Sequence, residues 1–247
     1  MFTPEQLAKE RADLVAETGS VEEGEARFAS EYLVDFEAAA PGSYYGSLLR
    51  EAQAAGRIGR VPYDPGLKVD TAWDLGIDDY TAIWFFQSVG REVRVIDYFE
   101  ASGEGLQAIA RVGISEKPYV YGRHYLPHDV KVREMGNSGK TRLETLGGLG
   151  LFNIEVGVAN GPEERVNAAR QLIPICWFDG EKCGLGLDRL RAYRKRMAGT
   201  TGLYAGPLHD EASHGADAFG EFAVNRLGVV TARPAVRVGA GALGWLG

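Results

Sequence analysis

Three short segments of the chain carry carboxylates and imidazoles in positions where they could bind a metal ion. The first contains Asp74, within VDTAWDLGIDD, a run that we predict to be a strand with apolar residues on both sides of the acid. An unpaired carboxylate in such a strand is costly to bury unless a cation lies beside it. The alternative is that Asp74 caps the following turn together with Gly76 and Asp78. The segment by itself leaves both interpretations open.

The second segment is YGRHYLPHD, in which a predicted strand ends at Pro127 and is followed by His128 and Asp129. These two side chains would lie at the carboxyl end of the strand, where ligands of α/β sheets commonly bind. The same pair is also typical of an ordinary turn.

The third segment is LHDEASHGADAF, which places His214 and Asp217 three residues apart on one face of a predicted helix. We expect Ser213 to cap the start of that helix. A histidine and an aspartate with this spacing can reach one metal ion, although they can also be a solvated pair. His209 and Asp210, just upstream, could join the site or end the preceding turn.

The elements that would position these residues follow from the periodicity of the sequence. Residues 1 to about 60 have helical spacing and are followed by VPYDPG at 61–66, a turn or linker composition, so we predict a helical extension or linker over residues 1–65. From residue 66 three strand-like runs follow in meander order: LKVDTAWDLG, YTAIWFFQSV and EVRVIDYFEA. The aromatic run IWFFQ is expected in the sheet core rather than as a platform for stacking bases.

The rest of the chain alternates between further helices and a strand. EGLQAIARVGISE is predicted to be helical and YVYGRHYLPHD to be a strand, after which the helical segments are TRLETLGG, PEERVNAARQLI, LDRLRAYRKRM and SHGADAFGEFAVNR. This order predicts an α/β fold, a mixed sheet flanked by helices, over residues 66–230. Residues 231–247 are rich in glycine and are expected to be a flexible tail.

Bulk properties limit the classes of function. The 247 residues carry a formal net charge of −7, so binding to nucleic acid would need local basic patches or bridging metal ions. Cys176 and Cys183 lack the spacing and neighbours of a zinc site and are expected to be reduced thiols. No run of eighteen apolar residues or signal-peptide pattern is present, and we expect a cytosolic protein without a membrane partner.

One segment imitates a nucleotide-binding loop. GNSGKT, at 136–141, ends like a phosphate-binding loop, but the full motif requires glycine where this chain has Glu134. We interpret it as a loop that leads into the TRLETLGG helix. Lys140 and Arg142 would then be near enough to Asp129 to contact DNA phosphates.

A second basic segment, KCGLGLDRLRAYRKRM, is predicted to be a helix with a positive surface. Arg194 and Lys195 are its candidates for contact with phosphates. The alternative is an ordinary solvated helix face.

Three acids on a first strand, at the end of a later strand and on a late helix form the arrangement of the ribonuclease H fold. The segments WDLGIDDYTAIWFFQ, YLPHD and PLHDEASHGADAF resemble the nuclease domain of large terminase subunits from tailed phages, over roughly residues 67–226. The resemblance implies that Asp74, Asp129 and Asp217 are metal ligands and that His214 lies beside the metals. Some relatives have glutamate at the second position, where Asp129 is one methylene shorter. Asp79 could support the ligands or cap its turn.

The resemblance also implies an activity and partners. The expected activity is a metal-dependent DNA endonuclease that cuts concatemeric viral duplex DNA during genome packaging, using two Mg²⁺ or Mn²⁺ ions about 3.5 to 4 Å apart. The chain has no Walker A motif, so residues 1–65 would lead from a preceding motor region. Expected partners are duplex DNA, the ATPase part of the packaging motor, the small terminase subunit and the portal, in the host cell cytoplasm.

Two other functions compete with this one. The chain could be a related nuclease with the same fold, such as a junction resolvase or a ribonuclease H, which would share the metals but not the substrate. It could also be a non-catalytic module that docks on DNA or the portal.

Overall fold

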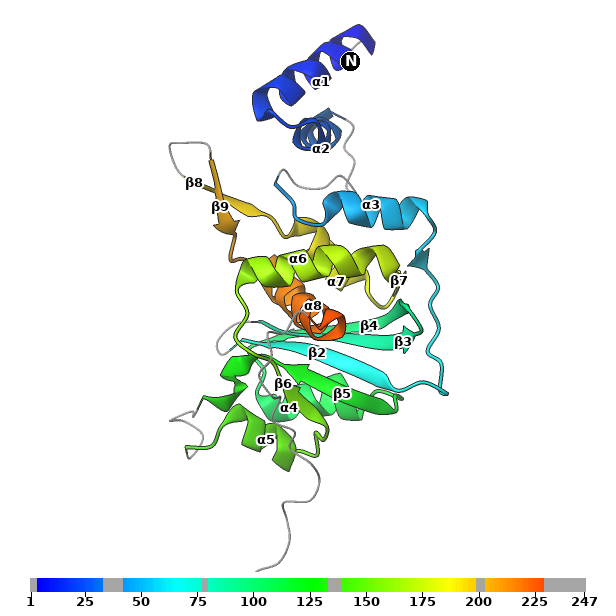
Figure 1. The fold of residues 1–247 in the computed structure, drawn as a ribbon, viewed down its shortest axis with the longest axis vertical. Helices are drawn as coiled ribbons and strands as arrows, with labels where there is room; N and C mark the ends of the chain where they lie inside the picture. Colours follow the sequence, from blue (N-terminus) through cyan, green and yellow to red (C-terminus); the bar gives the residue numbers. More distant parts are fainter. Residues whose placement is uncertain (1–3, 33–41, 77–79, 133–138, 199–202, 229–247) are drawn as a thin grey trace, which may run out of the picture.

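A seven-stranded mixed sheet forms the centre of the molecule (Figure 1). The computed structural model describes residues 4–32, 42–76, 80–132, 139–198 and 203–228. The strand order is β1-β7-β4-β3-β2-β5-β6. The strands are β1 (Ile58–Gly59), β2 (Val69–Leu75), β3 (Tyr80–Val89), β4 (Glu92–Ser102), β5 (Tyr121–Leu126), β6 (Ile154–Val156) and β7 (Cys176–Asp179).

Strands β2, β3 and β4 form the antiparallel meander that the sequence predicts. A tight turn joins β3 to β4, and Gly90 adopts a φ of 59° there, a conformation that favours glycine. The remaining strands pair in parallel: β5 with β2, β6 with β5, β7 with β4 and β1 with β7. The expected mixed sheet is therefore confirmed. Its short strands β1, β6 and β7 were not predicted from the sequence.

Helices cover both faces of the sheet. They are α3 (Gly46–Ala54), α4 (Leu106–Ala110) with a π-helical turn (Arg111–Ser115), α5 (Arg142–Gly148), α6 (Pro162–Leu172), α7 (Gly184–Ala192) and α8 (Glu211–Leu227), with 3₁₀ turns at His128–Lys131 and Ile173–Ile175. Figure 1 shows α3, α6, α7 and α8 on one side of the sheet and α4 and α5 on the other. Each face has its own buried apolar cluster.

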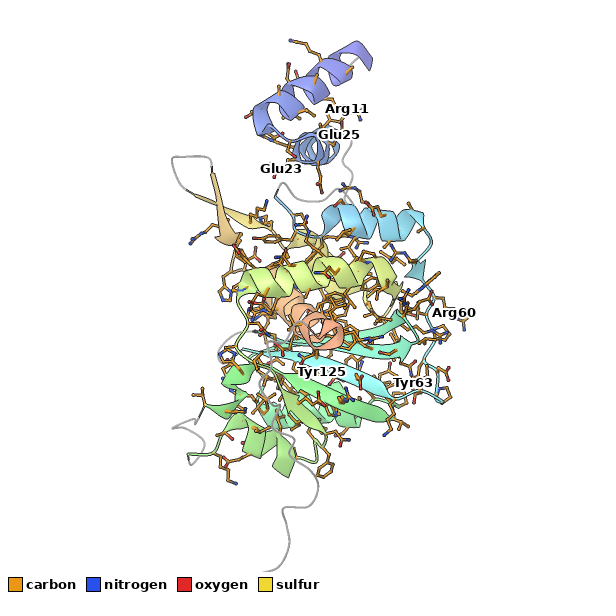
Figure 2. The ribbon with its side chains drawn as sticks, viewed as in Figure 1. Arg11, Glu23, Glu25, Arg60, Tyr63 and Tyr125 are labelled. Atoms are coloured by element: carbon orange, nitrogen blue, oxygen red, sulfur yellow. The ribbon has the colours of Figure 1, made fainter. Side chains whose placement is uncertain are left out.

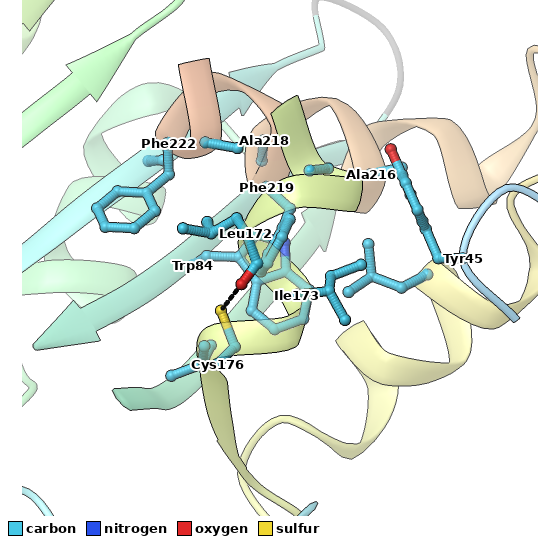
Figure 3. Close-up of a cluster of buried hydrophobic side chains, with 14 of the residues drawn as sticks. Tyr45, Trp84, Leu172, Ile173, Cys176, Ala216, Ala218, Phe219 and Phe222 are labelled. Carbon is cyan, nitrogen blue, oxygen red and sulfur yellow. Dashed lines mark hydrogen bonds between the residues drawn. The ribbon is translucent and has the colours of Figure 1, made fainter. Parts of the chain in front are cut away.

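The aromatic run of β3 supplies both clusters, because successive strand residues point to opposite faces. Trp84 and Phe86 face α8, whereas Ile83 and Phe85 face the α4 side, and all four are fully buried. Phe86 stacks on Phe222 of α8 with ring centroids 3.7 Å apart. Figure 3 shows the α8 side of this packing around Trp84. The expected role of IWFFQ as sheet core is confirmed.

Both cysteines are buried and free. Cys176 Sγ donates to Leu172 O over 3.3 Å (Figure 3), and Cys183 Sγ donates to Val95 O over 3.4 Å. Burial raises the pKa of both thiols. The prediction of reduced thiols agrees with these positions, since a buried thiol that stays protonated is unreactive.

The N-terminal helices α1 (Pro4–Thr18) and α2 (Val21–Tyr32) pack against each other. Gly24 makes this possible, because a Cβ there would lie 2.5 Å from Val15 Cα. Arg11 and Glu25, labelled in Figure 2, form an ion pair of 2.6 Å between the two helices. This pair is exposed, so apolar packing is expected to contribute more to the stability of the helix pair.

Residues 42–59 pack with the sheet rather than with those two helices. Tyr45 and Leu49 are 1% exposed and belong to the core on the α8 side, and β1 adds to the edge of the sheet. These residues thus share the core of the sheet, and the domain boundary near residue 65 stays a prediction. Residues 231–247, expected to be a flexible tail, lie outside the described residues.

The basic helix expected over 182–197 is wrong in its second half. Helix α7 ends at Ala192, and the chain continues extended into a hairpin of β8 (Lys195–Ala198) and β9 (Leu203–Pro207). Tyr193, 2% exposed, accepts a hydrogen bond at its carbonyl from Tyr44 N, and Lys195 N donates to Gly42 O. These long-range contacts override the helical preference of the segment.

No helix in the described part of the chain is long and apolar enough to cross a membrane.

Candidate active site

Asp74 and His214, 140 residues apart in sequence, meet at the carboxyl end of β2. His214 Nδ1 donates to Asp74 Oδ2 over 2.8 Å. The His214 side chain is 7% exposed and that of Asp74 is 26% exposed, so the carboxylate keeps an open side. The imidazole is further confined by the rings of Tyr80 and His209, at 5.9 and 5.5 Å between centroids. The first and third segments of the sequence prediction are thus brought together.

The local structure of α8 explains this placement. Helix α8 begins at Glu211, where Asp210 Oδ1 accepts from Ala212 N over 3.0 Å, so Asp210 is the cap. The expectation that Ser213 caps the helix is wrong, because Ser213 already lies in the first turn and its Oγ donates to Asp210 O. His209 Nδ1 lies 3.1 Å from Ser213 Oγ. His209 and Asp210 therefore help to start the helix that carries His214.

A close approach between α8 and the sheet sets the depth of His214. Gly215 follows it, and a Cβ at this position would lie 2.9 Å from both Tyr98 Oη and Arg189 Cβ. Its carbonyl accepts from Trp84 Nε1 over 2.7 Å. A larger residue at 215 would push α8 away from β4 and α7, and so disturb the placement of His214 against Asp74.

Asp217 lies one turn further along the same face of α8 and is paired with Arg165 of α6. Arg165 Nε donates to Asp217 Oδ1 over 3.1 Å, and Arg165 Nη1 donates to Asn160 O. Burial raises the pKa of Asp217, the charge of Arg165 lowers it, and the charge of Asp74 raises it again. The two carboxylates are therefore close enough to repel each other.

Glu221 is a fourth acid that the sequence prediction missed. It is 4% exposed, and burial raises its pKa to about 7 against the partial compensation of a hydrogen bond from Asn225 Nδ2, which lies 2.9 Å from Glu221 Oε1. The charges of Asp74 and Asp217 raise the pKa further. Gly157 leaves room for its carboxyl group, because a Cβ there would collide with it. Its spacing of seven residues from His214 along one helix face was the signal available in the sequence.

Asp129 lies at the same end of the sheet as Asp74. Strand β5 runs parallel to β2 with Tyr125 opposite Ala72, so the turn after β5 follows at the end of β2 that carries Asp74. Asp129 and His128 are both exposed in that 3₁₀ turn. Within the described residues, however, no three His, Cys, Asp or Glu side chains are grouped closely enough to hold a metal ion. Asp129 thus shares an edge of the sheet with the other acids, but its side chain does not join theirs.

The donor chemistry of this edge fits a hard divalent cation, which prefers carboxylate oxygens. One oxygen of each carboxylate is held in place: Asp74 Oδ2 by His214, and Asp217 Oδ1 by Arg165. Each carboxylate is thus oriented through one oxygen and offers the second.

The four basic residues expected at DNA occupy different environments. Lys140 is exposed. Arg142 is 6% exposed and its Nη1 donates to Leu75 O over 2.9 Å, so it holds the end of β2 instead of facing DNA. Arg194 Nη2 lies 3.4 Å from Asp210 Oδ2, and Lys195 is partly buried on β8. Asp79 lies outside the described residues.

The GKT segment forms a helix cap. Thr141 Oγ1 accepts from Glu144 N over 3.0 Å, and Glu144 Oε2 accepts from Thr141 N over 2.8 Å, which is a capping box for α5. The carboxylate of Glu144 thus occupies the backbone N–H of Thr141, which in a phosphate-binding loop would be available to a phosphate. This favours the expected interpretation of a loop that leads into a helix; residues 136–138 lie outside the described residues.

The order of the central strands, with an acid of the first strand facing the last helix, defines a ribonuclease H-like fold. Structural comparison finds a similar fold in solved large terminases. The large terminase of a thermophilic bacteriophage matches over 69% of this chain and 42% of its own, with a TM-score of 0.51 and 12% identity. The P22 large terminase nuclease domain matches over 69% of this chain and 89% of its own, with a TM-score of 0.50 and 16% identity.

The chain therefore has the fold of a large terminase nuclease domain, as the sequence motifs predict. It spans about two fifths of the length of the thermophilic phage terminase. No protein-family model matches the sequence, and no curated protein matches it.

Proposed function

We propose that the chain is a metal-dependent DNA endonuclease that cuts concatemeric viral duplex DNA during genome packaging. The observation that carries the proposal is the meeting of Asp74, His214 and Asp217 at one edge of a ribonuclease H-like sheet. Asp129 lies in the turn that follows the neighbouring parallel strand β5, at the same edge. A docking module would not require acids gathered at an energetic cost.

The residues of the chain would divide the work as follows. Asp74, Asp217 and Asp129 would hold two divalent ions, Mg²⁺ or Mn²⁺, with Asp129 moving in from its exposed turn. Bound there, such ions would stabilise the negative charge that develops on the phosphorane and on the leaving 3′ oxygen, and would lower the pKa of a bound water. His214 donates through Nδ1 to Asp74, so a neutral imidazole carries its lone pair on Nε2, which can accept a proton from the attacking water.

Contact with duplex DNA would use the basic side chains near this edge. Lys140 precedes α5, and Arg194 and Lys195 lead into the β8–β9 hairpin; all three are at least partly exposed. Because phosphates are contacted without reading bases, we expect little sequence preference. The ATPase part of the motor, the small terminase subunit and the portal are the partners that this function would need.

The proposal is tested by cleavage of supercoiled plasmid with Mn²⁺, Mg²⁺ or EDTA. The parent should cut only with metal, and Asp74→Asn, Asp129→Asn and Asp217→Asn should each lose at least about a hundredfold in rate, as expected when groups that hold transition-state charge are removed. Asp188→Asn, which changes an acid 71% exposed, is the matched control and should cut like the parent. His214→Ala should slow cleavage without abolishing metal binding.

The choice of substrate separates the competing functions. Preference for linear duplex over branched DNA and over an RNA–DNA hybrid supports the packaging nuclease. Preference for a branch or a hybrid supports a junction resolvase or a ribonuclease H. If the parent and the variants all bind DNA but none of them cuts it with any metal, the chain is a docking module.

A further inference from the structure

Arg165 places a fixed positive charge among the acids. Its Nε donates to Asp217, and its charge also lowers the pKa of Glu221. The side chain is 20% exposed, and that of Asp217 is 24% exposed, so water screens the pair only in part. A guanidinium is charged at any working pH, which makes it a permanent counter-ion.

The backbone around Arg165 fixes its position. The hydrogen bond from Nη1 to Asn160 O ties the guanidinium to the loop before α6. Gly220 brings α8 close, because a Cβ at that position would lie 2.7 Å from Arg165 Cβ. Arg165 therefore cannot withdraw far from Asp217 without moving α6 against α8.

A divalent ion bound by Asp217 would lie beside this guanidinium. Two cations that share one carboxylate repel each other, and the carboxylate cannot give its full charge to both. In the absence of the ion, the guanidinium reduces repulsion between Asp217 and Asp74, which would otherwise strain the junction of α8 with β2.

We propose that Arg165 is a built-in counter-ion of the acid cluster, which holds Asp217 in its metal-binding position while no divalent ion is bound and lowers the affinity for that ion. This inference rests on the proposed metal-dependent nuclease. Arg165 is then a positioning residue. Replacing it should strengthen metal binding, whereas replacing a ligand should weaken it.

Thermal unfolding of the whole chain, in EDTA and across a Mn²⁺ titration, tests it. In EDTA, Arg165→Gln should lower the Tm by about 5 °C or more, because removing one partner leaves a half-buried acid uncompensated. Mn²⁺ should then raise the Tm of the variant more than that of the parent, with a midpoint concentration about tenfold lower. Arg165→Lys, which keeps the charge, should resemble the parent in both measurements.

Lys117→Gln is the matched control. Lys117 Nζ lies 2.6 Å from Asp97 Oδ2, and the two side chains are 24% and 7% exposed, a burial similar to that of the Arg165 pair. This variant should lose Tm in EDTA and respond to Mn²⁺ at the parent's midpoint.

The outcomes separate the inference from the function on which it rests. A parent whose Tm does not respond to Mn²⁺ or Mg²⁺ would refute the metal site itself. If the parent responds and Arg165→Gln has the same midpoint, only the counter-ion role is overturned. If Arg165→Gln does not fold, Arg165→Lys decides. A lysine variant that folds with the Tm of the parent supports the counter-ion role, whereas one that also fails to fold would show that positive charge is not what Arg165 supplies.

Discussion

Glu221→Gln should remove a cost to stability that grows with pH. Burial raises the pKa of Glu221 from 4.5 to about 7 in the folded protein. The folded state therefore holds the proton more tightly than the unfolded chain does, and this contribution to stability is full below pH 4.5 and is lost as the pH rises to about 7. At about 1.4 kcal/mol for each pH unit between those values, the loss is about 3 kcal/mol.

Glutamine has the same shape and can still accept the hydrogen bond from Asn225, but it carries no charge. We expect the variant to match the parent at pH 4.5 and to exceed it by about 3 kcal/mol at pH 8, in EDTA so that no metal titrates the site. Urea unfolding at pH 4.5, 6 and 8 measures the difference. Glu163→Gln, at an exposed position in the first turn of α6, is the control and should not change the profile. If the free energies of unfolding of Glu221→Gln and the parent differ by the same amount at all three pH values, the reasoning is refuted.

Two further predictions concern the core. Phe222→Ala should cost about 3 to 5 kcal/mol in the free energy of unfolding, because it removes a fully buried ring that stacks on Phe86; chemical denaturation checks this, and a loss below about 1 kcal/mol would contradict the packing. His124→Asn should make the protein more resistant to acid. Burial lowers the pKa of His124 from 6.5 to about 4, so the stability that the neutral imidazole contributes is full above pH 6.5 and is lost as the pH falls toward 4. The free energies of unfolding at pH 4.5 and pH 7 should therefore differ less in the variant than in the parent.

The parts of the fold in which apolar and polar residues follow a regular pattern could be predicted from the sequence. The strands that became β2, β3 and β4 alternate or are uniformly apolar and are separated by turn residues, so their meander could be predicted. Strand β6 has three residues and β1 has two, which is too short for any period to show. Their pairing depends on partners far away in sequence, such as Phe178 for Ile58.

The same distinction applies to the site. His214 and Asp217 could be placed on one face because helical spacing is local. The buried state of Glu221 depends on Gly157 and on the position of β6, neither of which is local to α8. Arg142 has the residue type of a DNA contact, and only its hydrogen bond to Leu75 O reveals a structural role. Residue type and spacing therefore identified candidates, whereas long-range packing decided which of them share an environment.

The opposite pKa shifts of Glu221 and His124 lead to one last prediction. Between about pH 4.5 and 6.5, the stability contributed by Glu221 falls with rising pH while that contributed by His124 rises, each by about 1.4 kcal/mol per pH unit. In the parent these two slopes cancel. Glu221→Gln alone should expose a stability that rises with pH in this range, and His124→Asn alone one that falls. The double variant should be as flat as the parent, because the two side chains lie on different elements and titrate independently. A double variant with a steep slope would mean that some other buried group, and not this pair, sets the response of the protein to pH.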